Sequence, residues 1–194
     1  MNETSHPRQY EVVIAGEPLL TAEDLCRLHG GDCVELIEGV VRPLPATDLQ
    51  HGHICVNIGF ALMNHVREQG WGKVAINNPF VVVKRNPDTV FGPDLALYCH
   101  QRLPKNLLPD QLVAVAPDVV IEVVGSTERW LDVFGKTPDY LIAGVRAVVL
   151  VDVKSEAIGI YRDDAPPEIL RRSDTLTIPE ILPGFAVPLT SLFK

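Results

Sequence analysis

The run "PDVVIEVVG", residues 117–125, constrains the fold of this chain more than any other stretch. Branched apolar residues in such a run are typical of a strand that is buried on both faces of a sheet. Glu122 places a carboxylate inside the run, where it loses its hydration unless a partner compensates for it. We therefore expect either a metal ion or a salt bridge to a lysine or arginine across the sheet, and the run alone leaves both open.

The rest of the chain alternates between helical and strand-like segments, which predicts a mixed sheet flanked by helices, an α/β or α+β fold. Residues 48–70 form the clearest helix, because apolar residues recur there at every fourth position and Gly70 follows. The other expected elements are a short helix over 19–30 capped by Thr21, a hairpin over 33–44, strand-like runs over 73–85, 90–99 and 117–125, a helix between Thr127 and Ala143, a strand pair over 146–164, and an irregular tail with a short strand within 168–179.

Length and composition indicate a soluble globular protein of one domain, residues 20–194, preceded by an N-terminal extension, residues 1–19. The formal net charge of −8 argues against indiscriminate phosphate binding, although metal ions can offset negative charge at one site. We see no signal peptide and no membrane span, because Arg146 and Asp152 interrupt the longest apolar stretch. Four scattered cysteines without metal-ligand spacing are typical of a reducing cytoplasm.

Acidic residues at the strand-like runs are the candidates for chemistry. Asp94 opens the strand "DLALY" and Glu122 lies within the later run, so adjacent strands can bring the two carboxylates together. Two close carboxylates repel unless a cation lies between them, and Mg²⁺ prefers such oxygen ligands. Lys136 on the following helix, with Asp132 four residues before it, is a candidate second cation. Turn chemistry at Pro93-Asp94 and a solvated Asp132–Lys136 pair are the plain structural alternatives.

Several segments together resemble the Uma-type putative restriction endonuclease family, which belongs to the PD-(D/E)XK nuclease superfamily. The resemblance covers most of the chain, from about residue 20 to residue 193, and its most specific part is residues 117–152. It rests on these segments, in this order: "VELIEGVV", "LQHGHI", "FGPDLALY", "PDVVIEVVGSTERWLDVFGKTPDYLIAGVRAVVLVDV" and "LPGFAVPLTSLF".

The resemblance implies a restriction-endonuclease-like core, a central mixed sheet of about four main strands between helices, and Mg²⁺-dependent hydrolysis of DNA, with Mn²⁺ as a substitute. It implies metal ligation by Asp94, Glu122 and the carbonyl of Val123. The remaining implied roles are catalysis by Lys136, support of a second metal or a water by Glu35, orientation of water or phosphate by His51, and packing by Tyr140.

The chain departs from the family pattern at two places. The superfamily lysine two residues after the glutamate is absent, because position 124 is Val124. The resemblance implies that Lys136 on the next helix takes its place. The loop after the strand reads Gly-Ser-Thr-Glu (residues 125–128), where the family has Ser-Pro-Ser, and Pro138 follows Lys136 closely enough to start a new helical segment there.

Three functions fit these observations. The first is a cytoplasmic, metal-dependent endonuclease acting on DNA, as a homodimer. The second is a catalytically inactive protein that keeps the nuclease fold for binding or for homodimeric interaction. This reading is supported by the acidic charge and the low aromatic content, because nucleic-acid binding usually requires a basic surface with interleaved aromatics. The third is hydrolysis of a smaller phosphate ester.

Overall fold

The strand that contains Glu122, β7 (Val119–Val124), lies inside a six-stranded mixed sheet. The computed structural model describes residues 18–107, 112–125 and 129–194. Within the sheet, β7 is parallel to β8 and antiparallel to β6, and the remaining neighbours are antiparallel. The strand order is β10 (Glu168–Leu170), β9 (Ala157–Tyr161), β8 (Ala147–Asp152), β7, β6 (Leu95–Cys99) and β3 (Gly72–Ile76).

A second, four-stranded antiparallel sheet packs beside the central one. Its order is β2 (Val40–Pro43), β1 (Val34–Ile37), β5 (Thr89–Phe91) and β4 (Val81–Lys84). Two short strands, β11 (Thr175–Leu176) and β12 (Val187–Pro188), pair near the C-terminus. The fold class predicted from the sequence is therefore confirmed, with a central sheet of six strands where we expected about four main ones.

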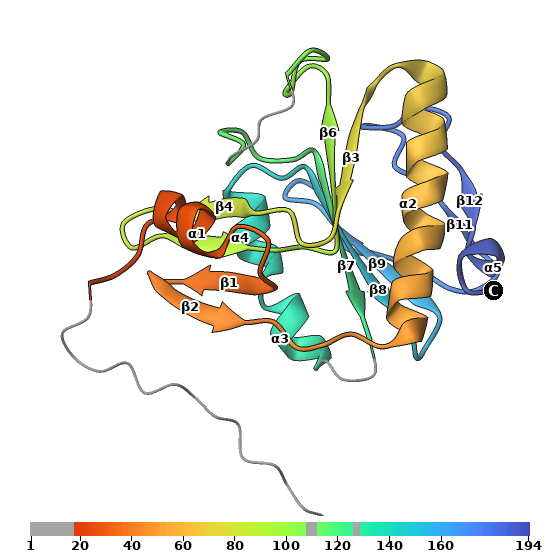
Figure 1. Ribbon diagram of the computed structural model, residues 1–194. Helices are drawn as coiled ribbons and strands as arrows, with labels where there is room; N and C mark the ends of the chain where they lie inside the picture. The colour runs from red at the N-terminus through yellow and green to blue at the C-terminus, as the bar shows by residue number, and fades with distance from the viewer. Residues whose placement is uncertain (1–17, 108–111, 126–128) are drawn as a thin grey trace, which may run out of the picture.

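Helices cover the central sheet on both sides. Figure 1 shows α2 (Leu49–Gln69) and α5 (Leu189–Leu192) on one side of it, and α3 (Trp130–Phe134), α4 (Thr137–Ile142) and the second sheet on the other. Alternation along β7 divides the core accordingly, because Ile121 and Val123 pack in the core that contains α2, whereas Val120 and Val124 pack in the core that contains α4. Glu122 therefore faces α4 and the second sheet.

The caps and turns expected from the sequence are present where the structure describes them. Asp48 caps the start of α2 by accepting a hydrogen bond from the N–H of His51, and Gly70 ends the helix in the left-handed conformation. The turn between β1 and β2 requires positive φ at Glu38 (49°) and Gly39 (80°), as a tight hairpin turn does.

The prediction was wrong for two runs that were each expected to form a single strand. Each run forms two strands, and these belong to different sheets. Residues 73–85 divide into β3 and β4 at Asn77 and Asn78, which both have positive φ, and residues 90–99 divide into β5 and β6 at Gly92-Pro93. The helix expected after Thr127 is also divided, into α3 and α4, because Pro138 is tolerated only in the first turn of a helix.

Three predicted features lie wholly or partly outside the described residues: most of the N-terminal extension, part of the loop between β6 and β7, and Ser126, Thr127 and Glu128 of the loop after β7. The four cysteines, all within the described residues, form no disulfide. Every helix in the described part of the chain is too short or too polar to cross a lipid bilayer.

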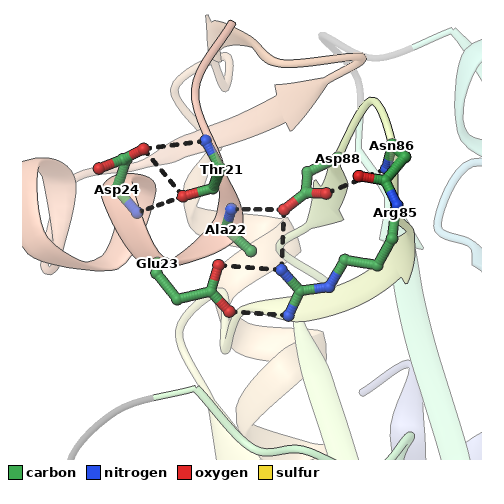
Figure 2. Close-up of polar contacts among 7 residues, drawn as sticks. All are labelled: Thr21, Ala22, Glu23, Asp24, Arg85, Asn86 and Asp88. Carbon is green, nitrogen blue, oxygen red and sulfur yellow. Dashed lines mark hydrogen bonds and ion pairs between the residues drawn. The ribbon is translucent and has the colours of Figure 1, made fainter.

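The second sheet is tied to α1 (Ala22–His29) through the buried carboxylate of Asp88 (Figure 2). Asp88 accepts hydrogen bonds from the N–H groups of Ala22 (2.8 Å) and Asn86 (3.2 Å) and pairs with Arg85 (2.8 Å). Burial alone raises the pKa of Asp88, but these donors outweigh it and hold the pKa below its usual range. Arg85 in turn forms two hydrogen bonds to Glu23, so the turn between β4 and β5 anchors the N-terminal end of α1.

We predict that Asp88→Ala lowers the free energy of unfolding by about 2–3 kcal/mol, because two backbone N–H groups lose their acceptor. Asp88→Asn keeps an acceptor oxygen and loses less. Urea denaturation followed by circular dichroism measures both, with Asp164→Ala at an exposed site as the control. A loss for Asp88→Ala no larger than that of the control contradicts the anchoring role.

Candidate functional site

The side chain of Glu122 enters the interface between the central sheet and the second sheet, where it is 5% exposed. Its oxygen Oε1 accepts a hydrogen bond from the hydroxyl of Tyr140 on α4 at 2.7 Å. The ammonium of Lys136 lies 3.9 Å from the same oxygen. The groups that compensate for the burial of this carboxylate are thus the hydroxyl of Tyr140 and the nearby ammonium of Lys136.

Lys136 stands at the N-cap position of α4, and its side chain turns into the interface. Its Nζ forms an ion pair with Oε1 of Glu35 on β1 at 2.6 Å and lies 5.4 Å from the ring centre of Phe91. The break before Pro138 therefore directs Lys136 toward Glu35 and Glu122. The same Glu35 oxygen accepts a hydrogen bond from the N–H of Gly92 at 3.0 Å.

Asp94 lies just before β6, at the end of the paired part of the sheet. The register places Leu95 opposite Ile121, so its continuation by one residue places Asp94 opposite Glu122. Oδ2 of Asp94 accepts a hydrogen bond from the N–H of Val123 at 2.7 Å. The β6–β7 pairing thereby brings the two predicted acidic ligands to one end of the sheet.

His51 reaches Asp94 from the other side, from the first turns of α2. Its Nε2 is 3.2 Å from both carboxylate oxygens of Asp94, and its Nδ1 is 3.6 Å from Sγ of Cys55. Burial disfavours the imidazolium, but the hydrogen bonds and charges of Asp94 and Cys55 outweigh burial and raise the pKa of His51 to about 10. His51 and Asp94 therefore form an ion pair at neutral pH.

The electrostatics of the interface favour an additional cation. Burial raises the pKa of Glu122, the negative charges of Asp94 and Glu35 raise it further, and Lys136 opposes both. The hydroxyl of Tyr140 also has a raised pKa, because the ring is fully buried beside the same carboxylates. The three carboxyl groups face two cations, Lys136 and the His51 imidazolium, and the raised pKa of Glu122 shows that its charge is not fully compensated. An oxygen-rich site of this kind fits a hard divalent ion such as Mg²⁺.

The structure brings together six of the residues singled out in the sequence. The six are Glu35, His51, Asp94, Glu122, Lys136 and Tyr140. Asp132 is exposed on α3, so its environment differs from theirs. Val123 takes part through its N–H, and the role of its carbonyl as a metal ligand stays a prediction.

Sequence reasoning missed three residues that contact the side chains of the site. Cys55 follows His51 by four residues, a spacing that places both on one face of α2 and was readable from the sequence. Phe91 and Gly92 precede Asp94, but their contacts with Lys136 and Glu35 depend on the second sheet, which the sequence did not reveal.

Comparison with known proteins agrees with the fold described above. The sequence pattern of the Uma2 family, described as "putative restriction endonuclease", matches residues 21–190. A crystal structure of a "putative nuclease belonging to DUF820" from Anabaena variabilis superposes with a TM-score of 0.77 at 18% identity, covering 90% of this chain and 97% of the other. At that identity the likeness shows the fold alone. A search of the curated proteins returned no match.

We predict that Tyr140→Phe lowers the free energy of unfolding by about 1–3 kcal/mol, because Glu122 loses a buried donor while the ring keeps its contact with Phe91. Chemical denaturation of the metal-free protein measures the change. Tyr161→Phe, at a half-buried tyrosine packed against the same core, is the control and should cost less. Equal stabilities of Tyr140→Phe and the unmutated protein would show that the hydroxyl does not stabilise Glu122.

Proposed function

The chain belongs to the Uma2 family of putative restriction endonucleases, and we propose that it is a Mg²⁺-dependent endonuclease that hydrolyses DNA phosphodiester bonds. The observation that carries the proposal is the convergence of Asp94, Glu122 and Lys136 at one end of the sheet. Carboxylates that hold a divalent ion and a lysine beside them are what phosphodiester hydrolysis requires, since charge develops on the phosphate oxygens.

In this proposal Asp94 and Glu122 hold Mg²⁺, with the Val123 carbonyl as a further ligand, and Mn²⁺ substitutes for it. An ion held by these residues would supply polarisation of the phosphodiester and a bound water of lowered pKa. The Val123 N–H orients Asp94, and the Tyr140 hydroxyl orients Glu122. Outer contacts of this kind keep the ligands in place.

Lys136 acts in the proposal as the cation that stabilises negative charge on the phosphate or positions the attacking water. Glu35 holds the Lys136 ammonium 2.6 Å away, and the N–H of Gly92 fixes the Glu35 carboxylate. Glu35 is thus a positioning residue for Lys136 and, near a second metal, a further oxygen ligand. His51 neutralises Asp94 from the side of α2 and orients water or phosphate.

The alternative is a catalytically inactive protein that keeps the nuclease fold for binding or as a homodimer. The ion pair of Asp94 with His51 favours it, because a carboxylate already satisfied by a cation has less need of a metal. Exposed apolar residues on α2, Val56 and Phe60, offer a surface for a second copy of the chain. Metal binding and DNA cleavage, measured separately, decide between the two functions.

We predict that Asp94→Asn and Glu122→Gln each slow Mn²⁺-dependent cleavage of plasmid DNA by about 100-fold or more, because the ion loses a charged ligand. A titration of Mn²⁺ against cleavage rate, with calorimetry of Mn²⁺ binding to the same samples, measures both properties. Glu68→Gln, at an exposed glutamate near the far end of α2, is the matched control and should leave both unchanged. Cleavage by both acidic-site variants at the unmutated rate refutes the proposal, and metal binding without cleavage supports the alternative.

Lys136→Met separates catalysis from metal binding. We expect cleavage to slow by about 100-fold, because the charge that stabilises the phosphate is lost. Mn²⁺ binding should persist or tighten, since a like charge leaves the neighbourhood of the ion. Lys84→Met, at an exposed lysine paired with Glu38, is the control. Unchanged cleavage by Lys136→Met would remove the lysine from the mechanism.

A further inference from the structure

A second set of metal-ligand atoms lies on the α2 side of Asp94. His51 and Cys55 are four residues apart on α2 and face Asp94 together. One ligand atom from each of the three side chains lies within 4.8 Å of the other two. His51 is 4% exposed, and both Cys55 and Asp94 are partly buried, so the group is shielded from bulk water.

The chemistry of these three groups differs from that of the carboxylate cluster. An imidazole, a thiol and one carboxylate make a borderline-soft set, which favours Zn²⁺ and similar ions over Mg²⁺. Zn–N bonds of about 2.1 Å and Zn–S bonds of about 2.3 Å separate the two ligand atoms of a tetrahedral site by roughly 3.6 Å. Nδ1 of His51 and Sγ of Cys55 are 3.6 Å apart, which fits such a pair. Asp94 contacts the other ring nitrogen, Nε2, at 3.2 Å, so it becomes the third ligand when one of its oxygens moves from Nε2 toward an ion on Nδ1.

The surroundings of the three side chains also hold them in position. The Asp48 side chain accepts from the His51 N–H and fixes the first turn of α2, from which His51 projects. The Val123 N–H donates to Asp94 and orients its carboxylate. Outer hydrogen bonds that orient the ligands are typical of protein metal sites.

We propose that His51, Cys55 and Asp94 form a binding site for a thiophilic divalent cation of the zinc class, with water in the fourth position. The site goes beyond the proposed nuclease activity, because it requires only the folded side chains. It uses three protein ligands and an open position, which is the arrangement of zinc sites that exchange their fourth ligand.

Asp94 belongs both to this group and to the proposed Mg²⁺ site, and one expected consequence of this rests on the proposed function. A zinc ion held by Asp94 and His51 withdraws Asp94 from the pair that it forms with Glu122. Zn²⁺ should therefore inhibit Mg²⁺-dependent cleavage, and Cys55→Ala should relieve this inhibition without abolishing cleavage. The binding measurement below uses no DNA, so failure of the zinc site and failure of the nuclease proposal are distinguishable.

Co²⁺ titration of the metal-free, reduced protein tests the site, because tetrahedral Co²⁺ bound to a thiolate shows visible ligand-field bands and a near-ultraviolet sulfur-to-metal band. We expect both in the unmutated protein and in Glu122→Gln. Cys55→Ala should lose the sulfur band, and its Zn²⁺ affinity, measured by competition with a chromophoric chelator, should fall by about tenfold or more. Cys55→Ser serves the same purpose if the alanine variant fails to fold.

Cys33→Ala is the matched control, because Cys33 is an exposed thiol that can bind metal adventitiously. Retention of both spectral bands in Cys33→Ala together with their loss in a folded Cys55 variant supports the site. The proposal is overturned if the unmutated protein shows no sulfur band, if the band survives in the Cys55 variants, or if it disappears in Cys33→Ala. Circular dichroism of each variant establishes that it is folded.

Discussion

The burial of the Glu122 carboxylate is the constraint on which the arrangement of this molecule depends. A carboxylate between two packed sheets is stable only if donors and cations surround it. Tyr140 and Lys136 bring α4 to it, and Lys136 in turn holds Glu35 of β1. The contacts of one buried charge thus join the central sheet, α4 and the second sheet, and they meet at the candidate site.

The alternation of side chains along β7 explains why the buried carboxylate has to be compensated on only one face of the sheet. Ile121 and Val123 complete the core under α2, and Glu122 between them must face the opposite side. A shift of one residue in register would place the carboxylate against the apolar face of α2, where Ile54 and Ile58 offer no hydrogen bond. Hydrophobic burial on one face and charge compensation on the other therefore specify the same register.

Local patterns in the sequence predicted the elements whose signals are local. Thr21, Asp48 and Gly70 marked helix ends correctly, and Pro138 marked the break that lets Lys136 enter the interface. The second sheet was not predictable in this way. An apolar run shows that a segment is buried, but it does not show against which sheet. Residues 73–85 and 90–99 therefore appeared as single strands, and the contacts of Glu35 with Lys136 and Gly92 were not derivable from spacing.

Asp94 lies between Glu122 of the central sheet and His51 of α2, and it therefore has two kinds of partner. On the side of Glu122 it belongs to a set of carboxylate oxygens, which suits a hard ion. On the side of α2 it meets an imidazole and a thiol, which suit a softer one. The single carboxylate of Asp94 cannot be a full ligand of an ion in both sets at once. The ion that occupies Asp94 is then decided by ligand chemistry and metal availability, and the His51 ion pair holds the carboxylate in place until a metal displaces it.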